Sequence, residues 1–145
     1  MKRTLFIAFV VAVICASVAH AECPELFIWD VLKRPAYAES YKRIVATETH
    51  LPDWLATSSN LARSVTTGAA SIKIVGENEY ESFSMCKSHE CDGSKSLVLF
   101  FGQHGEVVKG VLRDNRKLRF FGYPTNDERA ALLNELQPEP GYSTN

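Results

Sequence analysis

Beyond residue 21 the chain has no long apolar run, no internal repeat and no low-complexity tract. The missing apolar run argues against a later membrane-spanning helix, and the missing linkers argue against an array of small domains. Basic residues are not in excess either, since 16 Lys and Arg stand against 17 Asp and Glu. This balance argues against nucleic acid or an anionic membrane as the main partner.

The N-terminus has the features of a secretory signal peptide. Lys2 and Arg3 precede an apolar run that ends in the cleavage motif A-x-A at residues 19–21. We therefore expect residues 1–21 to be removed and residues 22–145 to form a single exported domain. Because the removed segment holds two basic and no acidic residues, the 16 basic side chains fall to 14 against 17 acidic ones, a net charge of −3. This mild acidity is compatible with a basic protein partner.

Cysteine is scarce, and Cys15 is lost with the signal peptide. Cysteines of exported proteins usually oxidise, and the simplest pairing joins Cys86 to Cys91 and leaves Cys23 unpaired. A loop this short closes at a β-turn, where Cα atoms come within the ~4.4 to 6.8 Å that a disulfide needs. Such a small ring adds little to global stability. We expect it instead to fix the shape of residues 87–90, as in a pre-organised recognition loop.

Apolar spacing predicts helices at both ends of the domain. Residues 35–46 repeat apolar positions at helical spacing. In "HLPDWL", Pro52 suits the first turn of a short helical segment that points Trp54 and Leu55 inward. Residues 125–137 begin with an N-cap candidate, Thr125 or Asn126, and with acids, then carry apolar residues on or near one face. This pattern predicts a C-terminal helix packed on a sheet.

Five short segments rich in β-branched and aromatic residues predict strands. They are residues 71–76, 78–86, 96–102, 106–112 and 117–123. Short turns join them, so we predict an α+β fold in which helices flank an antiparallel sheet of about five strands and a disulfide-closed loop protrudes. Neighbouring strand residues face opposite sides, so the pairs Phe100-Phe101 and Phe120-Phe121 indicate either a sheet covered on both faces or one exposed ring in each pair, and core packing is the favoured account. Trp29 belongs either to a docking helix or to a partner surface.

Two segments together resemble the inhibitor of vertebrate lysozyme (Ivy) family. "LPDWL" is followed by a polar spacer and then by "GENEYESFSMCKSHECDGSKSLVLFFG", and the resemblance runs from about Tyr41 to Leu112. The usual loop of this family reads Cys-Lys-Pro-His-Asp-Cys. This chain keeps the length of the loop but has Ser88 in place of Pro and Glu90 in place of Asp.

The resemblance implies a periplasmic protein that is not an enzyme, uses no cofactor, forms a homodimer and inhibits C-type lysozyme. It further implies that the loop enters the substrate cleft and that His89 lies between the two catalytic carboxylates. Lys87, Ser88 and Glu90 would contact lysozyme beside it. The loss of Pro frees one backbone dihedral angle of the unbound loop, and Glu90 reaches farther than Asp, so both changes bear on the strength of inhibition.

Three other interpretations of the loop are open at the level of sequence. Cys86, His89 and Cys91 are possible zinc ligands if the thiols are reduced, although their close spacing strains a tetrahedral site. A redox enzyme is disfavoured because the spacing is C-x4-C, not C-x-x-C. The stronger alternative is a non-inhibitory periplasmic binding or chaperone-like module in which His89 is simply an exposed turn residue.

Overall fold

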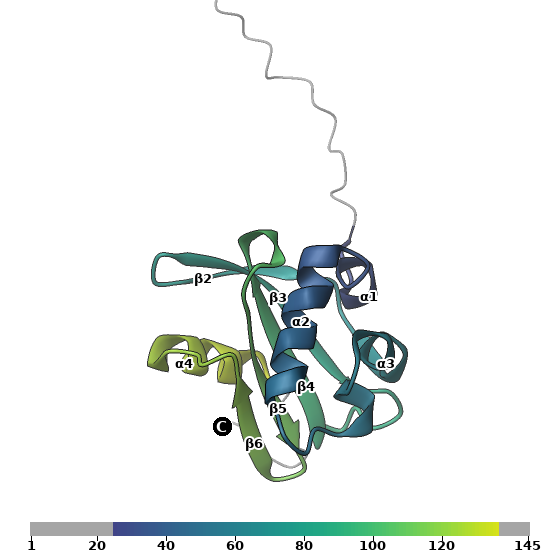
Figure 1. Cartoon of the computed structure of the whole chain (residues 1–145). Helices are drawn as coiled ribbons and strands as arrows, with labels where there is room; N and C mark the ends of the chain where they lie inside the picture. Colours follow the sequence, from purple (N-terminus) through teal and green to yellow (C-terminus); the bar gives the residue numbers. More distant parts are fainter. Residues whose placement is uncertain (1–24, 137–145) are drawn as a thin grey trace, which may run out of the picture.

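The computed structural model describes residues 25–136. Within this range it contains the following elements (Figure 1): α1 (Ile28–Val31), α2 (Pro35–Thr47), η1 (Asp53–Leu55), α3 (Ser58–Ser64), β1 (Val65–Thr67), β2 (Ser71–Val75), β3 (Asn78–Lys87), β4 (Lys95–Gly102), η2 (Gln103–Gly105), β5 (Val108–Asp114), β6 (Lys117–Phe121) and α4 (Asn126–Glu135). The predicted signal peptide and Cys23 lie outside the described residues. None of the helices in this part of the chain combines the length and the apolar character that crossing a bilayer requires.

The strands form one antiparallel sheet, so the predicted α+β class is confirmed. Its order is β1-β3-β4-β5-β6, and β2 pairs with the first half of β3. All five predicted strands are present. The short strand β1 was not predicted because its sequence, Val65–Thr67, lies in a polar stretch without alternation. It pairs with the last residues of β3 and therefore supports the base of the loop that follows.

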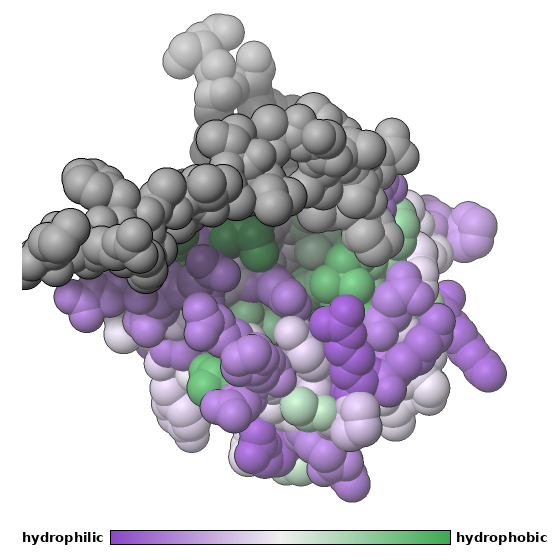
Figure 2. Space-filling view, turned by 90° about the horizontal axis from the view of Figure 1, so that it is seen from above, coloured by the Kyte–Doolittle hydropathy of each residue, from purple (hydrophilic) through white to green (hydrophobic). Residues whose placement is uncertain are grey.

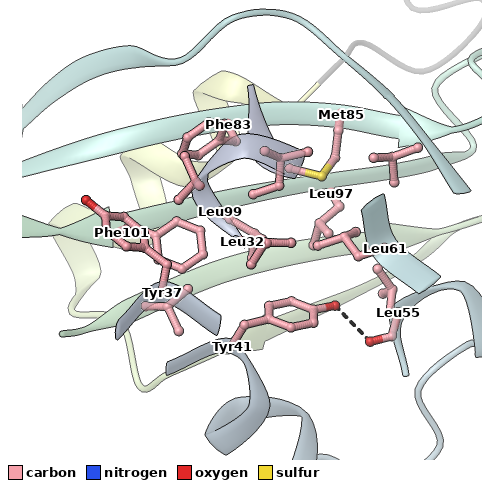
Figure 3. Packing of buried hydrophobic residues seen from close by; sticks show 14 of the residues in the cluster. Leu32, Tyr37, Tyr41, Leu55, Leu61, Phe83, Met85, Leu97, Leu99 and Phe101 are labelled. Atoms are coloured by element: carbon pink, nitrogen blue, oxygen red, sulfur yellow. Dashed lines mark hydrogen bonds between the residues drawn. The ribbon is translucent and has the colours of Figure 1, made fainter. Parts of the chain in front are cut away.

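Both faces of the sheet are covered, as the paired phenylalanines predicted. Phe101 is fully buried on one face, where its ring lies 5.2 Å from that of Tyr37 in α2. Phe100 is fully buried on the other face and stacks on Tyr80, in a cluster that includes Leu132 of α4. The larger of the two cores lies on the α2 side and receives residues from α1, α2, α3 and the sheet (Figure 3).

Helix α2 begins at Pro35, whose missing N–H suits a first helical turn, and its buried face contains Tyr37 and Tyr41. The Tyr41 hydroxyl donates to the carbonyl oxygen of Leu55 at 2.8 Å (Figure 3). Trp54 and Leu55 are both buried, as predicted. Burial raises the pKa of the Tyr41 hydroxyl. The hydrogen bond and the two buried side chains together fix the "LPDWL" segment against the core.

Trp29 lies in α1, which docks on the larger core. Ile28 and Val31 of this short helix are fully buried, and Trp29 is half-buried against the same core and stacks on Phe27 with ring centroids 4.9 Å apart. Of the two alternatives for Trp29, the packing therefore favours the docking helix.

Strand β2 alternates as predicted, yet its apolar face is uncovered. Ile72 and Ile74 are 58% and 74% exposed. Lys73, on the opposite face, forms an ion pair with Glu135 of α4 at 2.7 Å. β2 pairs with the first half of β3, and its isoleucines stay outside the buried core. The coloured residues visible in Figure 2 are mostly hydrophilic, with hydrophobic residues in small groups.

Helix α4 is fixed to the sheet by a buried carboxylate. The side chain of Glu128 is 2% exposed and accepts hydrogen bonds from the Tyr80 hydroxyl, from Lys109 Nζ at 2.6 Å and from the N–H of Thr125 at 2.7 Å. The Thr125 side chain accepts in return from the N–H of Glu128, which completes a capping box. The predicted C-terminal helix is therefore confirmed, together with its capping residue.

Candidate functional site at the disulfide loop

The loop between β3 and β4 is closed by a disulfide between Cys86 and Cys91, as the sequence predicted. The two Cα atoms are 5.1 Å apart, within the range that a disulfide requires. Cys86 is buried near the end of β3, where it pairs with Thr66 of β1 and Ser96 of β4. Cys91 is exposed. The bridge thus ties an exposed chain segment to the middle of the sheet.

His89 occupies the exposed tip of a tight turn inside this ring. The N–H of Glu90 donates to the carbonyl oxygen of Lys87 at 2.9 Å, which closes the turn. His89 adopts a φ of +66°, a left-handed conformation that residues other than glycine take up infrequently. Such backbone conformations cost about 1 to 3 kcal/mol and cluster at functional sites. Here the turn presents an imidazole to solvent.

Ser88 anchors the other side of the turn to the body of the protein. Its N–H donates to the carbonyl oxygen of Ser64 at 2.8 Å, at the end of α3. Helix α3 begins after Thr57, whose side chain accepts from the N–H of Asn60. The sequence analysis predicted neither this N-cap nor the strand β1 that follows. Thr57 could have been recognised as an N-cap, because threonine is a preferred residue at that position. Together they give the loop a rigid support.

The charged side chains of the loop are paired within the molecule. Glu90 accepts from Lys87 through one carboxylate oxygen, and its other oxygen lies 2.5 Å from Nζ of Lys95. Hydrogen bonds from Lys87 and then from Lys95 hold the pKa of the Glu90 carboxyl below its usual range, and Glu90 raises the pKa of Lys95. Lys95, the first residue of β4, was not singled out from the sequence. The sequence did offer one indication. Lys87 ends the strand before the loop and Lys95 begins the strand after it, so the two lysines face each other across the base of the loop.

The segment that returns from the loop to β4 is also ordered by hydrogen bonds. The Asp92 carboxylate accepts from the hydroxyl of Ser94 at 2.6 Å and from its N–H at 2.9 Å. These bonds, the hydroxyl first, lower the pKa of Asp92. The N–H of Asn115 in the β5–β6 turn donates to the carbonyl oxygen of Ser94 at 2.6 Å. The base of the loop is consequently connected to the neighbouring hairpin.

A groove of 570 Å³ lies beside the loop. It brings together the two sequence segments that carried the family resemblance, because its walls come from "LPDWL" and from both ends of the loop. Its lining residues are Pro52, Asp53, Trp54, Asn60, Ser64, Lys87, Lys95 and Asp114. Of the predicted site residues, Lys87 lines this groove. The LPxW element and the base of the loop therefore border one common groove.

The zinc alternative does not fit this geometry. The sulfur atoms of Cys86 and Cys91 are bonded to each other, and zinc needs cysteine as the free thiolate. His89 alone would be left from the set of three ligands that the sequence allowed. What the loop offers chemically is one exposed imidazole on a ring closed by a disulfide.

The chain is similar to a known protein along nearly its whole length. No family model matches the chain. A protein of Pseudomonas aeruginosa, "Inhibitor of vertebrate lysozyme", is 26% identical to it over 156 aligned residues, which cover 98% of this chain and 97% of that protein. The similarity thus extends over nearly the full length of both chains and beyond the span that resembled the family in the sequence.

Proposed function

We propose that this chain is a member of the inhibitor of vertebrate lysozyme family, and that it binds a C-type lysozyme and blocks cell-wall hydrolysis. In this proposal the ring of Cys86 and Cys91 enters the substrate cleft, and His89 contacts the two catalytic carboxylates. The observation that carries the proposal is the exposed His89 at the tip of a turn fixed by a disulfide. The full-length similarity to a protein named as an inhibitor supports it.

The chemistry of the imidazole suits this role. Retaining glycosidases such as lysozyme use two carboxyl groups about 5 Å apart, one protonated and one ionised. A single hydrogen bond of about 3 Å does not span that distance, whereas an imidazole has a nitrogen on each side of its ring. The neutral ring donates to one carboxylate and accepts from the other carboxyl group, and the charged ring donates to both. His89 would thus occupy the position of the scissile bond while offering no bond to cleave.

The neighbours of His89 would border the same contact. Ser88 is half-buried and held by its N–H, so its backbone is part of the support and its side chain lies at the edge of the contact. Lys87 and Glu90 are half-buried and paired with each other. We propose that lysozyme meets Lys87 and Ser88 around the inserted imidazole, and that Glu90 lies at the edge of this contact, paired with Lys87 as in the free loop.

The proposal includes a cellular setting. We propose that the protein is exported to the periplasm through the signal peptide at residues 1–21, acts there without a cofactor as an inhibitor and not as an enzyme, and so helps the bacterium to evade host defence.

We also propose that it forms a homodimer. Sedimentation velocity of the protein at micromolar concentration should then give a single species of twice the mass of residues 22–145, and a monomer at all concentrations would refute the dimer.

The central experiment measures lysis of a cell-wall suspension by C-type lysozyme at increasing concentrations of the folded protein. We expect lysis to fall to zero as the inhibitor exceeds the enzyme. Charges at the rim of an interface influence association more than a buried anchor does, so raised salt should weaken inhibition without abolishing it. Full lysozyme activity at a large excess of folded protein would rule out the proposed function and favour the non-inhibitory binding module.

The disulfide should matter for binding and little for folding. We expect Cys86→Ser combined with Cys91→Ser to change the free energy of unfolding only slightly, because the closed loop is very short. Inhibition should weaken, since lysozyme must then order residues 87–90 at a cost of about 0.5 to 1.5 kcal/mol for each immobilised side chain. Urea unfolding and lysozyme titration of the same preparation measure the two effects. Equal inhibition by parent and double variant would show that the ring does not pre-organise the loop.

A further inference from the structure

We propose that Glu90 and Lys95 act as a positioning pair, which holds His89 in its binding orientation by tying the loop to strand β4. This inference rests on the proposed function and adds a residue outside the ring, Lys95, to the inhibitory site. It also changes the role expected of Glu90. The side chain next to the inserted imidazole would act on His89 through the protein and would not serve as a contact with lysozyme.

The two members of the pair stand on parts of the protein with different rigidity. Lys95 is the first residue of β4, and its backbone is paired with Asp114 of β5. Glu90 lies in the loop directly after His89, and its carboxylate is 2.5 Å from Nζ of Lys95. The ion pair therefore links a residue of the sheet to the neighbour of the exposed imidazole. The disulfide and the bond from Ser88 to Ser64 fix the loop at other points.

Each oxygen of the Glu90 carboxylate already has a charged partner inside the molecule. One oxygen meets Lys87 and the other meets Lys95. Lys87 and Lys95 share this single acid. Without it, two ammonium groups at facing ends of β3 and β4 would repel each other, and the loop would separate from the sheet. The acid is thus placed to close the loop against β4.

Half-exposed ion pairs are individually weak, but this one holds a residue whose backbone conformation is unfavourable. Left-handed φ angles at residues other than glycine persist when the surrounding structure fixes them. The turn that contains His89 has one backbone hydrogen bond of its own, from Glu90 to Lys87, and both residues of that bond also belong to the charge network. Loss of the network should therefore increase motion at His89 before it affects the core.

The test compares variants that remove one charge of the pair with a variant that exchanges the two charges. Two quantities are measured for each variant: inhibition of lysozyme, and the order of the His89 backbone in the free protein. We expect Glu90→Gln and Lys95→Met each to weaken inhibition by about 3- to 10-fold and to lower the NMR order parameter of the His89 amide. The double variant Glu90→Gln with Lys95→Met should be no weaker than Glu90→Gln alone, because the two residues act as one unit. Exchanging the charges, with Glu90→Lys and Lys95→Glu together, should restore most of the inhibition and the order.

Lys73→Met is the matched control, because Lys73 forms a comparably exposed ion pair with Glu135 outside the loop. It should change neither inhibition nor the order of His89. If Glu90→Gln weakens inhibition while Lys95→Met does not, Glu90 contacts lysozyme directly and the positioning role is wrong. If the parent protein does not inhibit lysozyme, the proposed function fails, and the pair is then judged by the His89 order parameter: unchanged order in Glu90→Gln and Lys95→Met overturns it.

Discussion

His89→Ala should reduce the affinity for C-type lysozyme at least tens-fold and leave the thermal stability of the protein unchanged. In the proposed complex the imidazole lies in the desolvated centre of the cleft, between two groups that both need a partner. Removal of such an anchor commonly costs about 2 kcal/mol or more, because the partner groups are left unpaired. In the free protein His89 is exposed, so its truncation removes no packing from the core.

Two histidines of this chain provide unusually close controls. His50 and His104 are both exposed, and their φ angles of +60° and +61° match that of His89. Replacing each of them with alanine removes the same side chain from the same left-handed backbone, at positions outside the loop. His50→Ala and His104→Ala should therefore inhibit like the parent. This comparison separates the effect of the imidazole from any effect of alanine on the backbone.

A further variant tests the turn itself. Glycine adopts positive φ without steric cost, so His89→Gly should keep the shape of the turn while removing the imidazole. We expect the protein to unfold at the same temperature as the parent or slightly above it, and to lose inhibition as His89→Ala does. Titration of lysozyme with each folded variant decides the matter. If affinity survives in His89→Ala, the loop binds through Lys87, Ser88, Glu90 or its backbone, and the inserted imidazole has to be abandoned.

The elements of this fold that were predictable share a local origin. The hairpin of β2 and β3 follows from alternation on both sides of the turn at Gly76, and α4 follows from a capping residue before an apolar face. The disulfide was predictable because Cys86 and Cys91 are close enough in the sequence for a β-turn to bring them together. Each of these features depends on residues that are close together in the sequence, and local physics specifies them.

The features that escaped prediction depend on distant residues. Strand β1 is too short and polar to show alternation, and it exists because the end of β3 offers it an edge. Ile74 is exposed, and alternation alone does not encode whether a helix covers that face of the strand. Lys95 looked like an ordinary solvated residue at the start of a strand, and its pairing with Glu90 appears only once the loop has closed. The left-handed φ of His89 likewise has no sequence signature.

Glu128→Gln should lower the free energy of unfolding at pH 7 by about 3 kcal/mol, the cost of breaking a buried ion pair by removing one partner. The side chain keeps its shape, but Lys109 then loses its anionic partner and the Tyr80 hydroxyl loses a charged acceptor. Glu135→Gln, on the same helix, breaks the more exposed pair with Lys73, and it should cost less than about 1 kcal/mol. Inhibition at pH 7 by either folded variant should match the parent, because Glu128 and Glu135 lie outside the loop.

The same carboxylate should control stability in acid. Burial alone would raise the pKa of Glu128, but the hydrogen bonds from Lys109, Tyr80 and Thr125 outweigh it and lower the pKa from an ordinary value of 4.5 to about 2. A group whose pKa is lower in the folded protein contributes its full stability above the unfolded value and loses it as the pH falls through the folded value. The parent should therefore lose about 3 kcal/mol between pH 4.5 and pH 2 through this group.

Urea unfolding of parent and Glu128→Gln at several pH values between 7 and 2 measures this contribution directly. The two free energies of unfolding should differ most above pH 4.5 and draw together as the pH falls toward 2, because most of the stability that the charge of Glu128 supplies has then been lost. Glu135→Gln should show no such convergence, which distinguishes the buried network from the general loss of carboxylate charge in acid. A constant difference between parent and Glu128→Gln down to pH 2 would mean that the charge of Glu128 does not stabilise the fold, and that α4 is held by the packing of Leu132 and its capping box alone.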